Sequence, residues 1–214
     1  MTRKRVAVLA SGRGSNMAAL LDAAADPLFP AEVTLVLSNR PDAAALDRAR
    51  TAGIAALAVD HRPFGRDREA HERAIDAALG EHGIELVCLA GYMRLLTPWL
   101  VERWAGRMLN IHPSILPAFP GLHTHERALA AGCRLHGCTV HLVTAVMDEG
   151  PILAQAAVPV LPGDTPDLLA ARVLAQEHRL YPTALAALAR DGDVPMPGAT
   201  ASLVNPLPLL RGAP

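Results

Sequence analysis

Short apolar runs alternate with amphipathic stretches along most of the chain. The apolar runs, each of a length suited to one strand, cover residues 6–10, 32–38, 55–59, 85–91, 108–111, 137–143 and 152–160. The amphipathic stretches between the early runs cover residues 16–25, 43–52 and 67–81. Strands and helices that alternate at this spacing form βαβ units around a parallel sheet covered on both faces. The pattern therefore predicts an α/β fold with a Rossmann-like, doubly wound sheet.

The second half of the chain has a different pattern. Residues 137–143, "GCTVHLV", alternate polar and apolar side chains, and the run 152–160 carries Pro159 near its end. Both features favour antiparallel or edge strands. We therefore expect a mixed sheet that is mostly parallel in its N-terminal half. A long helix is predicted from Thr165 to about Arg190, kinked or broken at Pro182.

Length and charge narrow the possible organisation and partners. Residues 1–190 are expected to form a single domain, and residues 191–214 a tail rich in Pro, Gly and Ala that wraps the surface or frays. Lys plus Arg number 20 against 21 Asp plus Glu, which gives a formal net charge of -1. This balance indicates neither a nucleic acid nor an anionic membrane surface as a partner.

The cysteines and the N-terminus favour a cytoplasmic location. The first apolar run, residues 6–10, is too short for the apolar core of a signal peptide, and no other run could span a bilayer. Cys88, Cys133 and Cys138 form no CxxC pair, so we interpret them as reduced cysteines.

A stiff polar loop is the main candidate for chemistry. In "LNIHPSILPAFPG", residues 109–121, the prolines exclude a helix or a central strand, so a rigid loop is expected. If the strand before it continues, Asn110 and His112 point to the same side because side chains alternate along a strand. An amide can stabilise an oxyanion, and a histidine can transfer a proton near neutral pH. A purely structural His-Pro loop is the alternative.

A glycine-containing turn at residues 11–16, "SGRGSN", is the second candidate. It follows the first predicted strand and opens the first helix, where backbone N–H groups can face an anion. It lacks the third glycine of a dinucleotide fingerprint and the Gly-Lys-Ser/Thr of a P-loop, so a monophosphate fits better than NAD or ATP. The alternative is a tight turn in which Ser or Asn caps the helix.

Two further motifs carry charge or metal-ligand chemistry. Asp148 stands in "TAVMDEGPIL", and a carboxylate beside His112 would favour the imidazolium form and orient the ring. On its own, this segment is more typical of an Asx-type turn. His123 and His125 in "HTHE" are only two residues apart and have no accompanying zinc-ligand spacing, so no metal site is expected.

Taken in order, these motifs resemble the phosphoribosylglycinamide formyltransferase family from Val6 to about Pro182. The motifs that carry the resemblance are "SGRGSN", "LSNRPDA", "LAGYMRLL", "LNIHPSILPAFPGLHTH", "GCTVHLV", "MDEGPIL" and "AQEHRLYP". The resemblance implies a formyltransferase fold and transfer of a formyl group from N10-formyltetrahydrofolate, as co-substrate, to the amine of glycinamide ribonucleotide. This step belongs to purine (IMP) synthesis and yields formylglycinamide ribonucleotide and tetrahydrofolate, without a metal.

The resemblance also implies roles for individual residues. It makes Asn110, His112 and Asp148 the catalytic group. It places the substrate phosphate on Gly14, Ser15 and Asn16, and the glycinamide amine or ribose near Glu177. The folate would lie on Asn110 and on Met93, Arg94, Leu95 and Leu96, with Arg68 near its glutamate portion. Arg66 is the alternative to Arg68, because the local alignment needs one inserted residue.

Other protein classes share part of this motif pattern. Methionyl-tRNA formyltransferases and formyltetrahydrofolate hydrolases have the same Asn, His and Asp constellation, but the first should carry a basic RNA-binding domain and the second a regulatory domain. A noncatalytic nucleotide-binding module is a third alternative. Small-molecule substrates are the expected partners, and the sequence leaves open whether the chain forms a homodimer.

Overall fold

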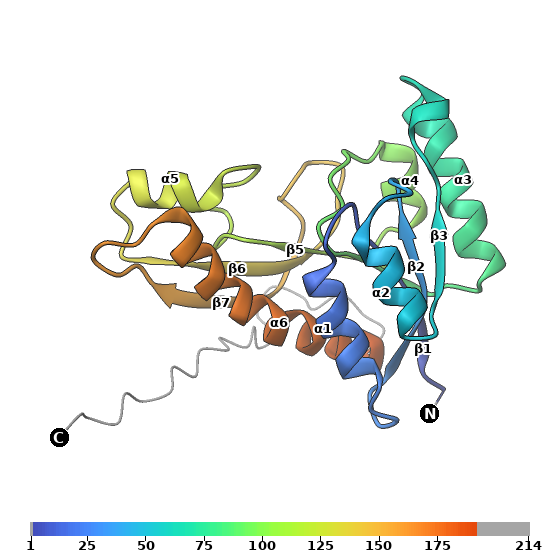
Figure 1. Cartoon of the computed structure of the whole chain (residues 1–214), viewed down its shortest axis with the longest axis horizontal. Helices are drawn as coiled ribbons and strands as arrows, with labels where there is room; N and C mark the ends of the chain where they lie inside the picture. Colours follow the sequence, from blue (N-terminus) through green and yellow to red (C-terminus); the bar gives the residue numbers. More distant parts are fainter. Residues whose placement is uncertain (1, 192–214) are drawn as a thin grey trace.

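The continuously apolar runs of the N-terminal half become neighbouring strands of a seven-stranded sheet (Figure 1). The computed structural model describes residues 2–191. In sheet order the strands are β3 (Ala55–Ala58), β2 (Ala31–Ser38), β1 (Lys4–Leu9), β4 (Leu86–Leu89), β5 (Met108–His112), β6 (Leu135–Leu142) and β7 (Ile152–Pro159). Strands β1 to β5 pair in parallel, whereas β6 pairs antiparallel with both β5 and β7. The predicted mixed sheet is therefore confirmed.

Helices cover both faces of this sheet. Helices α1 (Ser15–Ala24), α2 (Ala44–Thr51) and α6 (Pro166–Asp191) pack on one face, and α3 (Arg68–Glu81) and α4 (Pro98–Arg103) pack on the other. Alternate residues of β1 separate accordingly: Val6 and Val8 join the first core cluster, and Ala7 and Leu9 join the second. A strand buried on both sides must be apolar at every position, which explains the unbroken apolar runs.

Some helices differ from the sequence-based prediction. Helix α4, helix α5 (Thr124–Ala130) and a 3-10 turn at Arg62–Phe64 were not predicted, because six, seven and three residues are too few to show helical periodicity. Pro182 was predicted to kink or break the last helix; the break is wrong, since α6 continues through it, and the kink stays a prediction. Apolar residues on either side of Pro182, including Leu180, Leu185 and Leu188, are buried against the sheet and stabilise the helix.

Two expectations concern the C-terminal tail and membrane-spanning helices. The Pro-rich tail predicted from residue 191 onward falls almost wholly outside the described residues. Within residues 2–191, no helix has the length and apolar character needed to cross a membrane.

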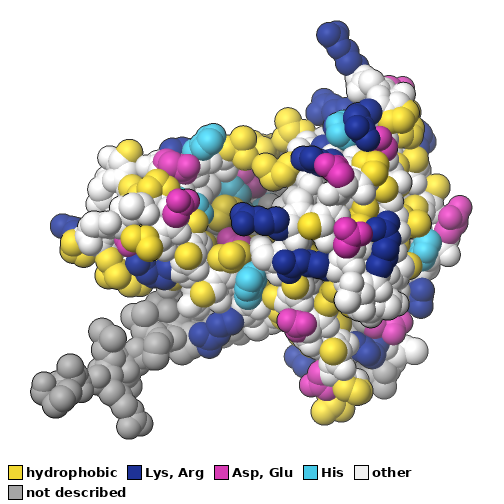
Figure 2. Space-filling model, in the orientation of Figure 1, with side chains coloured by type: hydrophobic (Ala, Val, Ile, Leu, Met, Phe, Trp, Pro, Cys, Tyr) yellow, Lys and Arg dark blue, Asp and Glu magenta, His cyan; other side chains and the backbone are white. Residues whose placement is uncertain are grey.

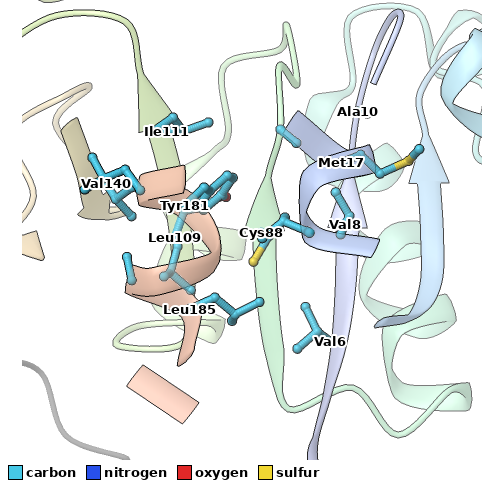
Figure 3. Close-up of a cluster of buried hydrophobic side chains, with 14 of the residues drawn as sticks. Val6, Val8, Ala10, Met17, Cys88, Leu109, Ile111, Val140, Tyr181 and Leu185 are labelled. Carbon is cyan, nitrogen blue, oxygen red and sulfur yellow. The ribbon is translucent and has the colours of Figure 1, made fainter. Parts of the chain in front are cut away.

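A buried tyrosine joins α6 to the centre of the sheet. Tyr181 is fully buried, and its ring lies among apolar side chains near Cys88 and Leu109 (Figure 3). Its hydroxyl lies 3.0 Å from the carbonyl oxygen of Leu89 in β4 and 3.1 Å from that of Leu109 in β5. Burial holds the pKa of this hydroxyl well above its usual range, so it remains a donor to these carbonyls. The longest helix is thereby attached to the seam between β4 and β5.

We expect Tyr181→Phe to lower the free energy of unfolding by about 1–2 kcal/mol, since it removes a buried donor and leaves its acceptors less satisfied. Urea denaturation followed by circular dichroism would measure this loss. Tyr92→Phe is a matched control, because the Tyr92 hydroxyl is buried but has no hydrogen-bond partner within the described residues. Equal stability losses in both variants would contradict the assigned role of the Tyr181 hydroxyl.

Candidate active site

The strand order reverses between β1 and β4, and the predicted binding segments begin at that point. From β1 the chain moves outward to β2 and β3, and then returns to place β4 on the other side of β1. The turn at residues 11–14 follows β1, and the segment Met93–Leu96 follows β4. Ligands of open α/β sheets bind at such switch points, beyond the carboxyl ends of the strands. In the same orientation, Figure 2 shows histidine and acidic side chains in a hollow between the surface over α5 and that over α1 and α2.

The turn after β1 leaves the start of α1 without a side-chain cap. Gly14 is the N-cap, with φ of 70° in the left-handed region, and no side chain accepts a capping hydrogen bond there. The alternative in which Ser or Asn caps the helix is therefore wrong. The first N–H groups of a helix have no partner within it. They can accordingly bind an anion, as predicted for Ser15 and Asn16.

Positive charge borders this helix start. A groove of about 470 Å³ extends from Ser15 along α1, and Arg48 of α2 and Arg179 of α6 also line it. The sequence-based analysis did not identify these two arginines, because only the packing of α2 and α6 brings them beside α1. The two arginines favour an anion in this groove, and Asp22, which also lines it, opposes them.

Asn16 and Glu177 meet across the contact between α1 and α6. The side-chain amide of Asn16 donates a hydrogen bond of 2.6 Å to Glu177, which is only 6% exposed. Burial raises the pKa of the Glu177 carboxyl above its ordinary value, and the bond from Asn16 opposes this shift. The Asn16 side-chain oxygen is buried and has no partner among the described residues. This pair thus retains capacity to bind polar groups of a ligand.

Asn110 and His112 lie on β5, as the continued strand predicts. The side-chain nitrogen of Asn110 is 3.2 Å from Nε2 of His141, the residue opposite it on β6. His141 Nδ1 lies 2.9 Å from the carbonyl oxygen of Leu142, to which it can only donate. Nε2 then carries the lone pair that accepts from Asn110. Burial, the main cause, lowers the pKa of His141, which agrees with this neutral form.

Asp148 reaches the same place from the loop between β6 and β7. Its Oδ2 is 3.5 Å from Nδ1 of His112, and its Oδ1 is 3.7 Å from Nε2 of His141. Asp148 has φ of 59° and accepts a 2.8 Å hydrogen bond from the Gly121 N–H, so two loops meet at this carboxylate. His112 Nε2 is 3.0 Å from the carbonyl oxygen of Phe119. Nε2 of His112 therefore faces a carbonyl acceptor at hydrogen-bond distance, and Nδ1 lies at ion-pair distance from a carboxylate.

His141, Gly121 and the Phe119 carbonyl are site groups that the sequence-based analysis did not identify. His141 could have been found only from the register that places it opposite Asn110. In the motif "HTHE", His125 Nδ1 lies 3.2 Å from Nε2 of His136, and His123 forms an exposed ion pair with Glu126. Burial, followed by the charge of His125, lowers the pKa of His136 to about 4.

Within residues 2–191, no group of three or more His, Cys, Asp or Glu side chains is arranged to hold a metal ion.

The predicted folate segment presents apolar side chains to solvent. Met93 is 66% exposed and Leu95 is 60% exposed, and Arg94 and Leu96 are half-buried. The exposed side chains Leu122, Val146 and Met147 come from the two loops that meet at Asp148. Arg66 and Arg68, just before α3 and at its first residue, are both exposed. The choice between these arginines stays a prediction.

Comparisons with known proteins agree on one family. The model of the formyl transferase family matches residues 4–185. The phosphoribosylglycinamide formyltransferase of Escherichia coli is 46% identical over 191 residues, which cover 89% of each chain. The trifunctional purine biosynthetic protein adenosine-3 of Drosophila melanogaster is 48% identical over 87% of this chain, which spans only 14% of that protein's length.

A solved structure is also similar. The crystal structure of phosphoribosylglycinamide formyltransferase from Brucella melitensis has 58% sequence identity and a TM-score of 0.84, and the match covers 88% of this chain and 96% of that one. In the Escherichia coli and Brucella melitensis proteins the match covers most of both chains, whereas in the trifunctional protein it covers only a small part of the longer chain. The chain therefore belongs to the formyl transferase family, within the phosphoribosylglycinamide formyltransferases of purine biosynthesis.

Proposed function

We propose that Asn110, His112 and Asp148 carry out the formyl transfer of this family, from N10-formyltetrahydrofolate to the amine of glycinamide ribonucleotide. The observation that supports this most directly is the placement of the Asp148 carboxylate 3.5 Å from His112 Nδ1, with both side chains less than 10% exposed. A buried carboxylate beside an imidazole stabilises the positive charge on the ring. A charged ring can donate a proton or a hydrogen bond to a developing anion.

Each residue has a distinct part in the proposed reaction. The substrate amine attacks the formyl carbon, and negative charge develops on the formyl oxygen. The amide N–H of Asn110 and Nε2–H of His112, released from the Phe119 carbonyl, stabilise that oxygen. The bond between the formyl carbon and N10 then breaks, and one proton passes from the attacking nitrogen to N10. Asp148 keeps His112 charged and orders the path of this proton.

The acceptor substrate would lie between α1 and α6. Its phosphate would bind the N–H groups of Gly14, Ser15 and Asn16, where the helix dipole and the nearby Arg48 and Arg179 favour negative charge. Glu177, held by Asn16, would bind the ribose or the glycinamide end. This arrangement would direct the amine toward β5.

The donor would lie along Met93–Leu96, with the pteridine against the backbone of this segment and the glutamate end near Arg68. The proposal includes a cytoplasmic location and small-molecule substrates. It includes neither a nucleic acid nor a membrane as a partner, and the near-zero formal charge of -1 supports this exclusion. Both a monomer and a homodimer are compatible with the arrangement.

We expect Asp148→Asn to lower kcat about 10²- to 10⁴-fold, a typical loss for general acid–base catalysis, with little change in either KM. Asparagine tolerates the left-handed backbone at this position and can still accept from Gly121, so the loop should keep its shape. Rates across pH for wild type, Asp148→Asn, His112→Ala and the double variant would test the coupling.

Residues that act as one unit give losses that do not multiply, so the double variant should resemble the worse single variant. Glu149→Gln is the matched control, because it removes a neighbouring exposed carboxylate in the same loop and should keep wild-type rates. Multiplicative losses from Asp148 and His112 would refute the coupling and leave Asp148 as a turn residue.

The phosphate site is best tested by changing the substrate. Gly14 cannot be substituted cleanly, because a Cβ there would lie 2.9 Å from Cβ of Ala45. We expect glycinamide riboside to bind at least about 100-fold more weakly than the ribotide, since even two of the three proposed hydrogen bonds to the phosphate would contribute about 3 kcal/mol together. Calorimetric titration would measure both affinities, and equal binding would exclude the phosphate site.

We expect Arg68→Ala to raise the KM for formyl-folate about two- to fivefold, with a smaller effect on kcat, because an exposed ion pair contributes less than about 1 kcal/mol. Arg66→Ala is the matched control from the same segment and should behave like wild type. If the two variants exchange these results, Arg66 is the residue that faces the folate.

A further inference from the structure

We propose that Ser11 and Asn39, outside the reacting group, are positioning residues that hold the donor-binding segment Met93–Leu96 in place. This inference rests on the proposed binding of formyl-folate to that segment. Ser11 comes just after β1 and is 6% exposed; Asn39 follows β2 directly and is 4% exposed. Both are buried polar residues at the carboxyl ends of their strands, and the reaction proposed above uses neither of them.

Ser11 holds the chain on both sides of Tyr92. Its backbone N–H donates to the carbonyl of Gly91 at 3.1 Å, and its hydroxyl oxygen accepts from the N–H of Met93 at 2.8 Å. A serine hydroxyl has one proton, and here that proton is donated to the side-chain oxygen of Asn39 at 2.6 Å. Asn39 therefore orients the hydroxyl so that a lone pair faces Met93.

Asn39 is itself held by the next strand. Its backbone carbonyl accepts a 2.9 Å hydrogen bond from Nδ1 of His61, which follows β3. The contacts thus cross from β3 to β2, β1 and β4, which are consecutive in the sheet. Ser11 and Asn39, the two buried members of this series, thereby link the end of β2 to Met93, and the half-buried His61 holds the backbone of Asn39.

Within the segment Met93–Leu96, most backbone groups make no hydrogen bond to the described residues. Its far end is fixed by Glu72 of α3, 2% exposed, which accepts from the Thr97 N–H at 2.8 Å and from the Thr97 hydroxyl. Between these two anchors, the backbone groups of Arg94, Leu95 and Leu96 make no hydrogen bond to the described residues. Free backbone groups on a fixed segment are suited to the polar edge of a heterocycle, since no ordering cost is incurred on binding.

Removal of the Ser11 hydroxyl should therefore weaken donor binding selectively. We expect Ser11→Ala to raise the KM for formyl-folate up to about tenfold, the effect of one lost buried hydrogen bond, and to change the KM for glycinamide ribonucleotide less than about twofold. Amide hydrogen exchange at Met93 should become faster in this variant. Asn39→Ala should have the same two effects, and Asn39→Asp, which keeps an acceptor for the hydroxyl, should restore most of the affinity.

Ser38→Ala is the matched control, because Ser38 is a fully buried serine at the end of β2 whose hydroxyl, among residues 2–191, accepts only from the nearby Arg40 N–H. It should leave the KM for formyl-folate and the exchange at Met93 unchanged. The positioning role is overturned if Ser11→Ala and Asn39→Ala keep the wild-type KM for formyl-folate, or if Ser38→Ala raises it equally. If Ser11→Ala does not fold, the pair Asn39→Ala and Asn39→Asp decides the same question. Failure of the wild-type protein to bind or use formyl-folate would instead refute the proposed function.

Discussion

The parallel pairing of β1 with β2 on one side and β4 on the other is the constraint from which the site follows. Backbone hydrogen bonds continue to the end of β1, where Ala10 donates to Leu37 and the carbonyl of Leu9 accepts from Ala90. Beyond Ser11, which still donates to Gly91 and accepts from Met93, the two segments separate, because β1 continues into α1 on one face of the sheet and β4 leads to α4 on the other. The crevice between them is a consequence of this topology.

Buried polar groups around the crevice fall into two kinds. Ser11 and Glu72 have their hydrogen-bonding groups paired with backbone or side-chain partners, and so they hold segments in position. The Asn16 side-chain oxygen is buried without a partner in the described part of the chain, and Glu177 keeps a raised pKa because it is buried. An unpaired buried polar group costs about 1–3 kcal/mol, which a polar ligand can recover on binding. The first kind therefore holds the scaffold, and the second agrees with the ligand contacts proposed for Asn16 and Glu177.

The loops that meet at His112 have unusual backbone conformations. Phe119, His123 and Asp148 have φ values of 56°, 58° and 59°, in the left-handed region that favours glycine. Such conformations cost about 1–2 kcal/mol each and persist where surrounding contacts hold them. At Phe119 and Asp148 those contacts direct a carbonyl and a carboxylate at the two nitrogens of one imidazole. The local strain is thus coupled to the geometry proposed for catalysis.

Features that depend on local periodicity could be predicted from the amino-acid order alone. Burial on both faces makes the central strands apolar throughout, and the period of two along β5 places Asn110 and His112 on one side. The turn that opens α1 and the existence of the long α6 were likewise readable from the chain. Short helices such as α4 and α5 were not, because they span less than two turns.

Only the tertiary structure decided which distant residues meet. Asn16 and Glu177 are 161 positions apart, and Ser11 and Met93 are 82 apart. His141 faces Asn110 because of the antiparallel register of β5 and β6, and Asp148 reaches His112 because its loop also binds Gly121. Periodicity records whether a residue is buried, whereas these contacts depend on strand order and register, which are set by packing across the whole chain.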